Sequence, residues 1–194
     1  MLRTDAILET IRMFHEENLD VRTVTLGLDL RGCASSNLDE LRQRIAMRIE
    51  QFAGQLVEHA DTVGRQFGIP IVNKRIAVSP IASVAAGHDR DAMVAVATTL
   101  DQAAENVDVD FIGGYSAMVH KRITPAGRNL IESLPEALNT TSRVCSSLSV
   151  ATTRAGINMD AVNLAGHTLR DIAFHSNNTN HMAPAKLVIF ANMP

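Results

Sequence analysis

The feature that most constrains the fold is the alternation of strand-like and helix-like segments along the chain. Runs rich in apolar and β-branched residues, such as VRTVTLGLDL at 21–30, precede segments whose apolar residues recur every three or four positions. Such alternation favours a mainly parallel sheet with helical crossovers, either open or closed into a barrel. We expect one α/β domain over residues 1–194. Strands are predicted at 21–30, 69–72, 75–79, 107–119, 143–153 and 185–194, and helices at 36–68, 90–105 and 158–176, with short helical pieces at 124–141.

The longest predicted helix begins at an N-cap, Ser36 or Asn37, and ends at Gly68. Its apolar residues keep a helical spacing throughout, and Pro70 prevents continuation. At about 1.5 Å per residue the helix would be roughly 45 Å long. An amphipathic helix is also expected at the N-terminus, because acidic residues interrupt the apolar run there and exclude a signal peptide. Its apolar face would consist of Ile7, Leu8, Ile11 and Phe14.

The composition excludes several classes of protein. A net charge of −3 argues against a surface that binds nucleic acid, and no apolar run is long enough to cross a bilayer. The two cysteines, Cys33 and Cys145, have neither disulfide-framework nor zinc spacing. We therefore expect free thiols and a reducing, cytoplasmic compartment.

The sequence contains none of the motifs that mark common chemistries. It has no GxGxxG or GxxxxGK[ST] nucleotide motif and no GxSxG nucleophile elbow. Its seven histidines show no HExxH or other metal-ligand spacing. We expect no metal site and no cofactor, and the sequence identifies no catalytic residue and no reaction.

Two segments carry candidate ligand contacts beside apolar runs. Lys74 and Arg75 are either the solvent-facing end of a strand or cations directed at an anionic ligand. Gly113 and Gly114 either form a bulge with close packing or let the backbone approach a ligand, with Ser116 beside them. The pattern leaves both alternatives open at each segment.

A third candidate is the segment RVCSSLSVATTRAGINMD, at 143–160. On a strand, alternate residues from Arg143 to Ser149 would share one face, which places a thiol and two hydroxyls beside a cation. Cys145 is then either a reactive thiol or a small buried residue. A glycine turn and a helix start follow, and helix N-termini bind anions. We hypothesise an anion cradle in which Cys145 is a lining residue. Its further members would be Ser147, Ser149, Thr152, Thr153, Gly156 and Asn158.

Several long motifs, in order, resemble one protein family. They are DVRTVTLGLDL, GIPIVNKRIAVSPIA, DFIGGYSAMV, SLPEAL, VCSSLSVATTRAGINMDAV and KLVIFANMP. The chain resembles the DUF711 or UPF0210 family, often labelled "PFL family protein", over essentially its whole length. The resemblance implies half of a pyruvate formate-lyase-like β/α barrel, and no glycyl radical chemistry. Family members are about twice as long or longer, so the chain would correspond to their N-terminal part.

Three functions are compatible with this reading. The chain could be an enzyme that binds a small anionic metabolite, a non-catalytic sensor, or a structural half-barrel that assembles with a second half. The segment KLVIFA reads as a strand buried on both faces, and a parallel sheet needs both faces covered. We therefore also expect a homo-oligomer or association with a missing C-terminal half.

Overall fold

The computed structural model describes residues 22–176 and 181–191, together with residues 8, 11–13 and 16. The amphipathic helix expected at the N-terminus therefore lies largely outside the described residues, including its Ile7 and Phe14. Leu8 and Ile11 are described; both are helical and exposed. Within the described chain, no helix has the length and apolar character needed to cross a membrane.

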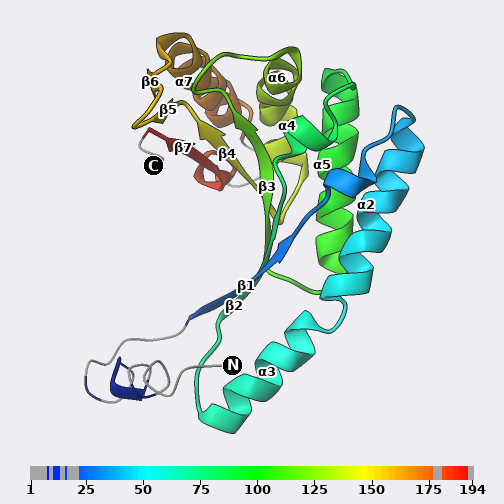
Figure 1. The fold of residues 1–194 in the computed structure, drawn as a ribbon, viewed down its shortest axis with the longest axis vertical. Coiled ribbons are helices and arrows are strands. Elements are labelled where there is room, and N and C mark those ends of the chain that lie inside the picture. Colours follow the sequence, from blue (N-terminus) through cyan, green and yellow to red (C-terminus); the bar gives the residue numbers. More distant parts are fainter. Residues whose placement is uncertain (1–7, 9–10, 14–15, 17–21, 177–180, 192–194) are drawn as a thin grey trace.

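The core of the fold is a parallel sheet of five strands, as the alternating pattern predicts (Figure 1). The strands follow one another across the sheet in chain order, and every neighbouring pair is parallel. A sheet wound in one direction is consistent with half of a β/α barrel. Its strands are β1 (Thr23–Leu28), β2 (Asn73–Val78), β3 (Phe111–Met118), β4 (Val144–Ser149) and β7 (Leu187–Phe190).

Helices cover one face of this sheet, because successive parallel crossovers of the same hand return on the same side (Figure 1). Neighbours in this layer are α2 with α5, α5 with α6, and α6 with α7. The helices are α2 (Leu38–Ala53), α3 (Leu56–Phe67), α4 (Ile81–Val84), α5 (Arg90–Asn106), α6 (Pro125–Thr140) and α7 (Met159–Phe174). Short elements complete the chain: the 3-10 turns η1 (Arg31–Cys33) and η3 (Ala183–Lys186), and the hairpin of β5 (Ala151–Thr152) and β6 (Gly156–Ile157).

The two faces of the sheet differ in residue size and polarity. Toward the helices, large apolar side chains such as Ile76, Ile112 and Leu148 are buried. On the opposite face, the register pairs Gly27 with Ala77, Ala77 with Gly113, and Gly113 with Cys145. The central strands therefore present a row of small residues on the face that the helices leave open.

Gly114 forms a β-bulge in β3, where the register to β4 shifts between Gly113 and Tyr115. Its φ of 110° favours glycine. A Cβ at this position would lie 2.4 Å from the Val78 carbonyl oxygen, so β2 and β3 approach too closely for any side chain. The Gly113–Gly114 pair is thus accounted for by a bulge and close packing.

Several predicted helix ends are confirmed. Asn37 caps α2, its side chain accepting from the Glu40 amide at 3.0 Å. Gly68 ends α3 in the left-handed conformation. The predicted single helix over 36–68 is wrong, however, because α2 ends at Ala53, with Gly54 as its C-cap, and α3 begins at Leu56. A Cβ on Gly54 would meet the Glu50 carbonyl oxygen at 2.7 Å, so the bend depends on glycine.

Two further boundaries differ from the sequence prediction. Residues 69–72 are not a strand: the Ile69 amide donates to the Gly64 carbonyl and the Val72 amide to the Arg22 carbonyl. The short pieces expected over 124–141 form one helix, α6, which runs through Pro135. Burial of its apolar face outweighs the cost of about 3 kcal/mol for an internal proline.

Candidate functional site: a basic cavity at the carboxyl edge of the sheet

The carboxyl ends of the parallel strands meet at one edge of the sheet, where ligands of α/β proteins commonly bind. β3 runs there into a loop at 119–123, and β4 ends beside it, with the Val119 amide donating to the Ser149 carbonyl at 2.9 Å. Helices α6 and α7 both begin at this edge, so two helix N-termini lie above adjacent strand ends.

The start of α6 is fixed by a cap and by close packing. Thr124 is the N-cap, its hydroxyl accepting from the Gly127 amide at 3.1 Å, and Pro125 fits the first turn. A Cβ on Gly127 would lie 3.2 Å from both Thr124 Oγ1 and Val119 Cγ1, so glycine lets the helix dock on the end of β3. The loop residues 121–123 are thereby held between β3 and the first turn of α6.

Asn158 fixes the start of α7 and ties it to the same place. Its side-chain oxygen accepts from the Ala161 amide at 3.2 Å, which confirms the predicted helix start. Its side-chain amide donates to the Val119 carbonyl at 2.7 Å, and its backbone amide to the Val150 carbonyl at 2.9 Å. One residue therefore joins the ends of β3 and β4 to α7.

Between the two helix starts lies a cavity of about 540 Å³, called here the basic cavity. Its α7 wall is one helical face, formed by residues one turn apart. The lining residues are Lys121, Arg122, Ile123, Arg128, Asn158, Asp160, Asn163, Leu164 and His167.

The basic cavity has the opposite charge from the chain as a whole. Three cationic side chains and one carboxylate give it a formal charge of +2 with His167 neutral, whereas the whole chain carries −3. Among the residues that the structure describes, Arg128 pairs only with Glu132, at 3.6 Å and exposed to solvent. Lys121 and Arg122 have no hydrogen bond or ion pair with another described residue, and the first turn of α6 contains no acidic side chain. The cavity is therefore suited to an anion.

Lys74 and Arg75, the two cations of β2 that were predicted as ligand contacts, point to different sides of the sheet. The ammonium of Lys74 forms a 2.7 Å ion pair with Asp61 of α3. Arg75 lies on the open face, with its guanidinium carbon 5.4 Å from the centroid of the Phe111 ring, a cation–π contact. Only Arg75 thus shares a face with the row of small residues.

Arg143 lies at the amino edge of the sheet, away from the helix starts. Its backbone amide donates to Asp101 at 2.6 Å, and its guanidinium donates to the Val109 carbonyl at 2.7 Å, just before β3. Asn158 lies beyond the other end of β4, roughly 20 Å away at the rise of an extended strand. The structure does not bring Arg143 together with the glycine turn that follows β4.

Cys145 lies on the open face, half-buried, and is a free thiol, as is the buried Cys33. Burial raises the pKa of the Cys145 thiol, and the charges of Lys186 and Arg75 oppose this to a lesser extent. Burial also lowers the pKa of the Lys186 ammonium, which donates to the Thr141 carbonyl at 2.5 Å. A raised thiol pKa fits a lining residue better than a nucleophile.

The predicted hydroxyl residues divide between the open face and the hairpin. Ser116 and Ser147 are register partners on adjacent strands, and Ser149 follows at the carboxyl edge. Ser149 is 5% exposed, and its hydroxyl has no partner among the described residues. Thr152, Thr153 and Gly156 lie in the β5–β6 hairpin, where the Thr152 hydroxyl accepts from the Ala155 amide at 3.0 Å.

Of the predicted residues, only Asn158 lines the basic cavity. The cations of its β3 loop, Lys121 and Arg122, were not among the predicted contacts. A signal was present: Lys121 and Arg122 follow a predicted strand after one residue and precede a Thr-Pro helix start. Among the described residues, no three His, Cys, Asp or Glu side chains gather in a way that could hold a metal ion.

Comparison with known proteins gives one consistent family. A family model described as "Uncharacterised ACR (DUF711)" matches residues 12–194. A "UPF0210 protein" of Acetivibrio thermocellus is 52% identical over 194 residues, covering the whole chain and 43% of that relative. "UPF0210" proteins of Methanococcoides burtonii and Methanocaldococcus jannaschii are each 50% identical, with 43% and 44% of their lengths covered. The chain thus spans less than half the length of these relatives.

Proposed function

Because the chain belongs to the DUF711 family, whose relatives carry names that state no reaction, we propose a function from its own geometry. The proposed function is that the protein binds a small anionic metabolite in the basic cavity, without glycyl radical chemistry. The observation that carries the proposal is the pair Lys121 and Arg122, which have no partner in the described part of the chain and lie between the N-termini of α6 and α7.

The cavity offers an anion three kinds of favourable interaction. Lys121, Arg122 and Arg128 can donate charge-assisted hydrogen bonds, each worth about 1.5–3 kcal/mol where water is excluded. The helix N-termini add positive potential, which α6 does not cancel with an acidic first turn. Asn163 and Asn158 line the same wall and provide amide groups.

The lining also limits the class of ligand. A cavity of about 540 Å³ lies within the usual range of small-molecule sites. Asp160 on the rim would repel a second carboxylate from that side, so the anionic group should face the β3 loop. A phosphate- or carboxylate-bearing molecule of ordinary metabolite size fits this arrangement.

Calorimetric titration with inorganic pyrophosphate and with citrate tests the proposal, and the two probes separate phosphate from carboxylate preference. The double substitution Lys121→Ala/Arg122→Ala should weaken binding of the preferred probe by about tenfold or more. Arg170→Ala, an exposed arginine of α7 outside the cavity, should leave binding unchanged. Equal affinity of the double variant and wild type would overturn the proposal. Turnover of a bound ligand would make the protein an enzyme, and binding alone a sensor.

A second candidate, the structural half-barrel, is favoured by the apolar surface of β7. Val188, Ile189 and Phe190 are 48, 37 and 47% exposed, and β7 is an edge strand of the sheet as described. We propose that this edge and the open face pack against the remaining part of the family fold, or against another copy. Light scattering at micromolar concentration should detect a species larger than 21 kDa. A folded monomer that also fails to bind the C-terminal part of a family member would exclude this candidate.

Both cysteines are free thiols, the usual state in a reducing compartment. We place the protein in the cytoplasm as part of the same proposal. Extraction under thiol-blocking conditions offers a check: a disulfide found in the extracted protein would contradict this location.

A further inference from the structure

The α7 wall of the basic cavity carries three polar side chains that have no partner in the described part of the chain. Asp160, Asn163 and His167 follow one another at spacings of three and four, so they line the cavity from one face of the helix. All three are exposed, and none has a side-chain hydrogen bond or ion pair with another described residue. The wall therefore offers unmatched hydrogen-bonding groups to a ligand in the cavity.

The carboxylate of the α7 wall is kept apart from the cations of the same cavity. Lys121 and Arg122 lie in the loop after β3 and Arg128 in α6, whereas Asp160 lies in the first turn of α7. Among the described residues, none of these cations forms an ion pair with Asp160. The cavity therefore has a basic part and a separate part that is rich in hydrogen-bond acceptors.

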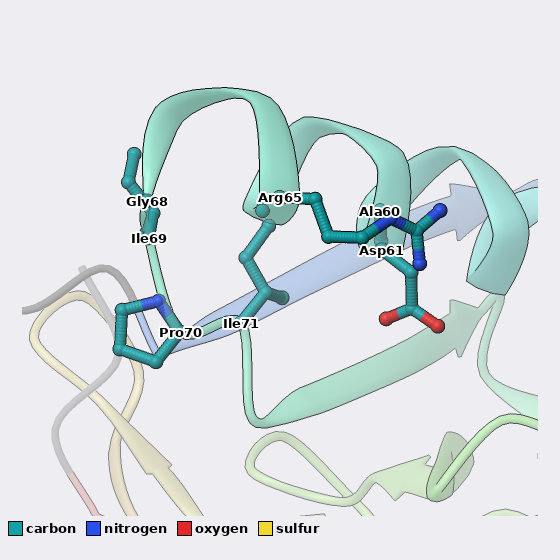
Figure 2. A pocket seen from close by; sticks show the side chains of 8 residues that line it. Ala60, Asp61, Arg65, Gly68, Ile69, Pro70 and Ile71 are labelled. Carbon is teal, nitrogen blue, oxygen red and sulfur yellow. The ribbon is translucent and has the colours of Figure 1, made fainter.

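Helix α3, which extends beyond the end of the sheet in Figure 1, provides a contrast. It has an exposed apolar stripe that includes Val63 and Phe67, and on another side an open pocket of about 480 Å³ (Figure 2). The two charged side chains that line this pocket already have partners. Asp61 forms a 2.7 Å ion pair with Lys74, and the Arg65 guanidinium donates a 3.3 Å hydrogen bond to the threonine three residues earlier. The groups of the α7 wall, in contrast, remain available to a ligand.

The chemistry of the α7 wall selects the group that would face it. The carboxylate of Asp160 only accepts hydrogen bonds, whereas the amide of Asn163 both donates and accepts. A hydroxyl group also does both, so neighbouring hydroxyls can satisfy this mixed wall, while an ammonium group would leave the amide N–H groups unmatched. Among the described residues that line the cavity, none is phenylalanine, tyrosine or tryptophan, so stacking of a planar base is not favoured.

We propose that the ligand of the basic cavity is a hydroxylated anion of the polyol phosphate or sugar acid class. Its anionic group binds Lys121 and Arg122, and its hydroxyl groups bind Asp160 and Asn163. This inference rests on the proposed function, because it takes the anion site as given and adds the recognition of the other end of the ligand.

A matched pair of ligands tests the inference by calorimetric titration. Glycerol 3-phosphate and propyl phosphate share a three-carbon phosphate monoester and differ in their hydroxyl groups. The wild type should bind glycerol 3-phosphate about tenfold more tightly, because a hydrogen bond to a charged group contributes on this scale. For a cavity that prefers citrate to pyrophosphate, glycerate and propionate provide the same comparison. Equal affinity within the pair, or tighter binding of phosphoethanolamine than of glycerol 3-phosphate, would overturn the inference.

Substitution of the carboxylate separates ligand recognition from a purely structural role. Asp160→Ala should weaken binding of the hydroxylated probe by about tenfold and leave its partner probe bound as well as before, or more tightly, because a negative charge is lost. Asp171→Ala, an exposed carboxylate of α7 outside the cavity, is the matched control and should change neither affinity.

Two further outcomes distinguish this inference from the proposed function. A carboxylate that serves only the dipole of α7 would lower the melting temperature of Asp160→Ala without changing the ratio of the two affinities, and that result would overturn the inference alone. Absence of binding by pyrophosphate, citrate and all the smaller probes would overturn the anion site itself, and the inference with it.

Discussion

The two edges of the sheet make different kinds of surface from similar residues. At the carboxyl edge, Asn158 and Thr124 fix two helix starts on strand ends, and cations line a concave cavity. Beyond the amino edge, α3 presents an apolar stripe, and Asp61 and Arg65 line an open pocket on another side of the same helix. The first arrangement has unbalanced charge and suits a small anion. The second has one acidic and one basic side chain and therefore no excess charge.

The difference shows that the packing around a charged side chain determines how strongly it can bind a partner. Lys121 and Arg122 are held near a rigid frame, so binding an anion there requires little ordering of the backbone. Arg65 lies on a helix that few other elements contact, and an exposed ion pair is worth at most about 1 kcal/mol.

Replacing glycine by alanine should change the free energy of unfolding most, and the same change can be made in the sheet and in α3. Gly114→Ala places a Cβ 2.4 Å from a carbonyl oxygen at a positive φ, and should lower the free energy of unfolding by about 3 kcal/mol or more. Gly64→Ala meets Ile69 O at 2.9 Å, a longer contact at a negative φ, and alanine favours the helix, so the loss should be smaller, about 1–2 kcal/mol. Urea unfolding measures both. Equal losses would mean that α3 is as tightly packed as the sheet.

Truncating a large apolar side chain to alanine should give the next largest difference in stability between the two regions. Leu130→Ala, in the fully buried face of α6, should cost about 2–5 kcal/mol. Phe67→Ala should change the unfolding free energy of the dilute monomer by less than about 0.5 kcal/mol, because the ring is mostly exposed. A thermal melt at low protein concentration provides the comparison. A large loss for Phe67→Ala would show that α3 packs against the rest of the monomer.

Removing a helix cap should lower stability by a smaller amount, and only one of two such substitutions should also weaken binding. Asn158→Ala removes a cap and a bond to the end of β3, and should cost about 1–2 kcal/mol and weaken pyrophosphate binding. Asn37→Ala removes only the cap of α2 and should cost about 1 kcal/mol without affecting binding. Chemical denaturation and calorimetry on both variants check this. Equal binding losses would mean that Asn158 contributes only general stability.

The smallest expected effect concerns pH. Hydrogen bonds from Arg31 and Ser79 lower the pKa of Asp29, at the carboxyl end of β1, well below its usual value. The stabilisation is present above the unfolded pKa of about 3.9 and is lost as pH falls toward the folded value. Melting temperature should therefore fall less on acidification for Asp29→Asn than for wild type, between about pH 5 and about pH 3. Glu58→Gln on α3 is the control, and an identical acid response for all three proteins would contradict the assignment.

The sequence allows the sheet to be predicted better than the site. Period-two and helical patterns, with caps such as Asn37 and Asn158, identify most strands and helix starts. The break at Gly54 escapes prediction because the apolar spacing continues across both helices, and only the Glu50 carbonyl contact reveals it. Strand alternation assigns the correct face to Cys145. It says nothing of the distance from Arg143 to the helix starts, nor of which loops converge on one cavity.

Amide chemical-shift mapping with inorganic pyrophosphate shows where on the chain an anion binds, and so tests whether its site is the basic cavity. Saturable shifts confined to residues 121–128 and 158–167 are expected. Shifts centred instead on the open face around Arg75 and Cys145, or no saturable shift at all, would contradict it.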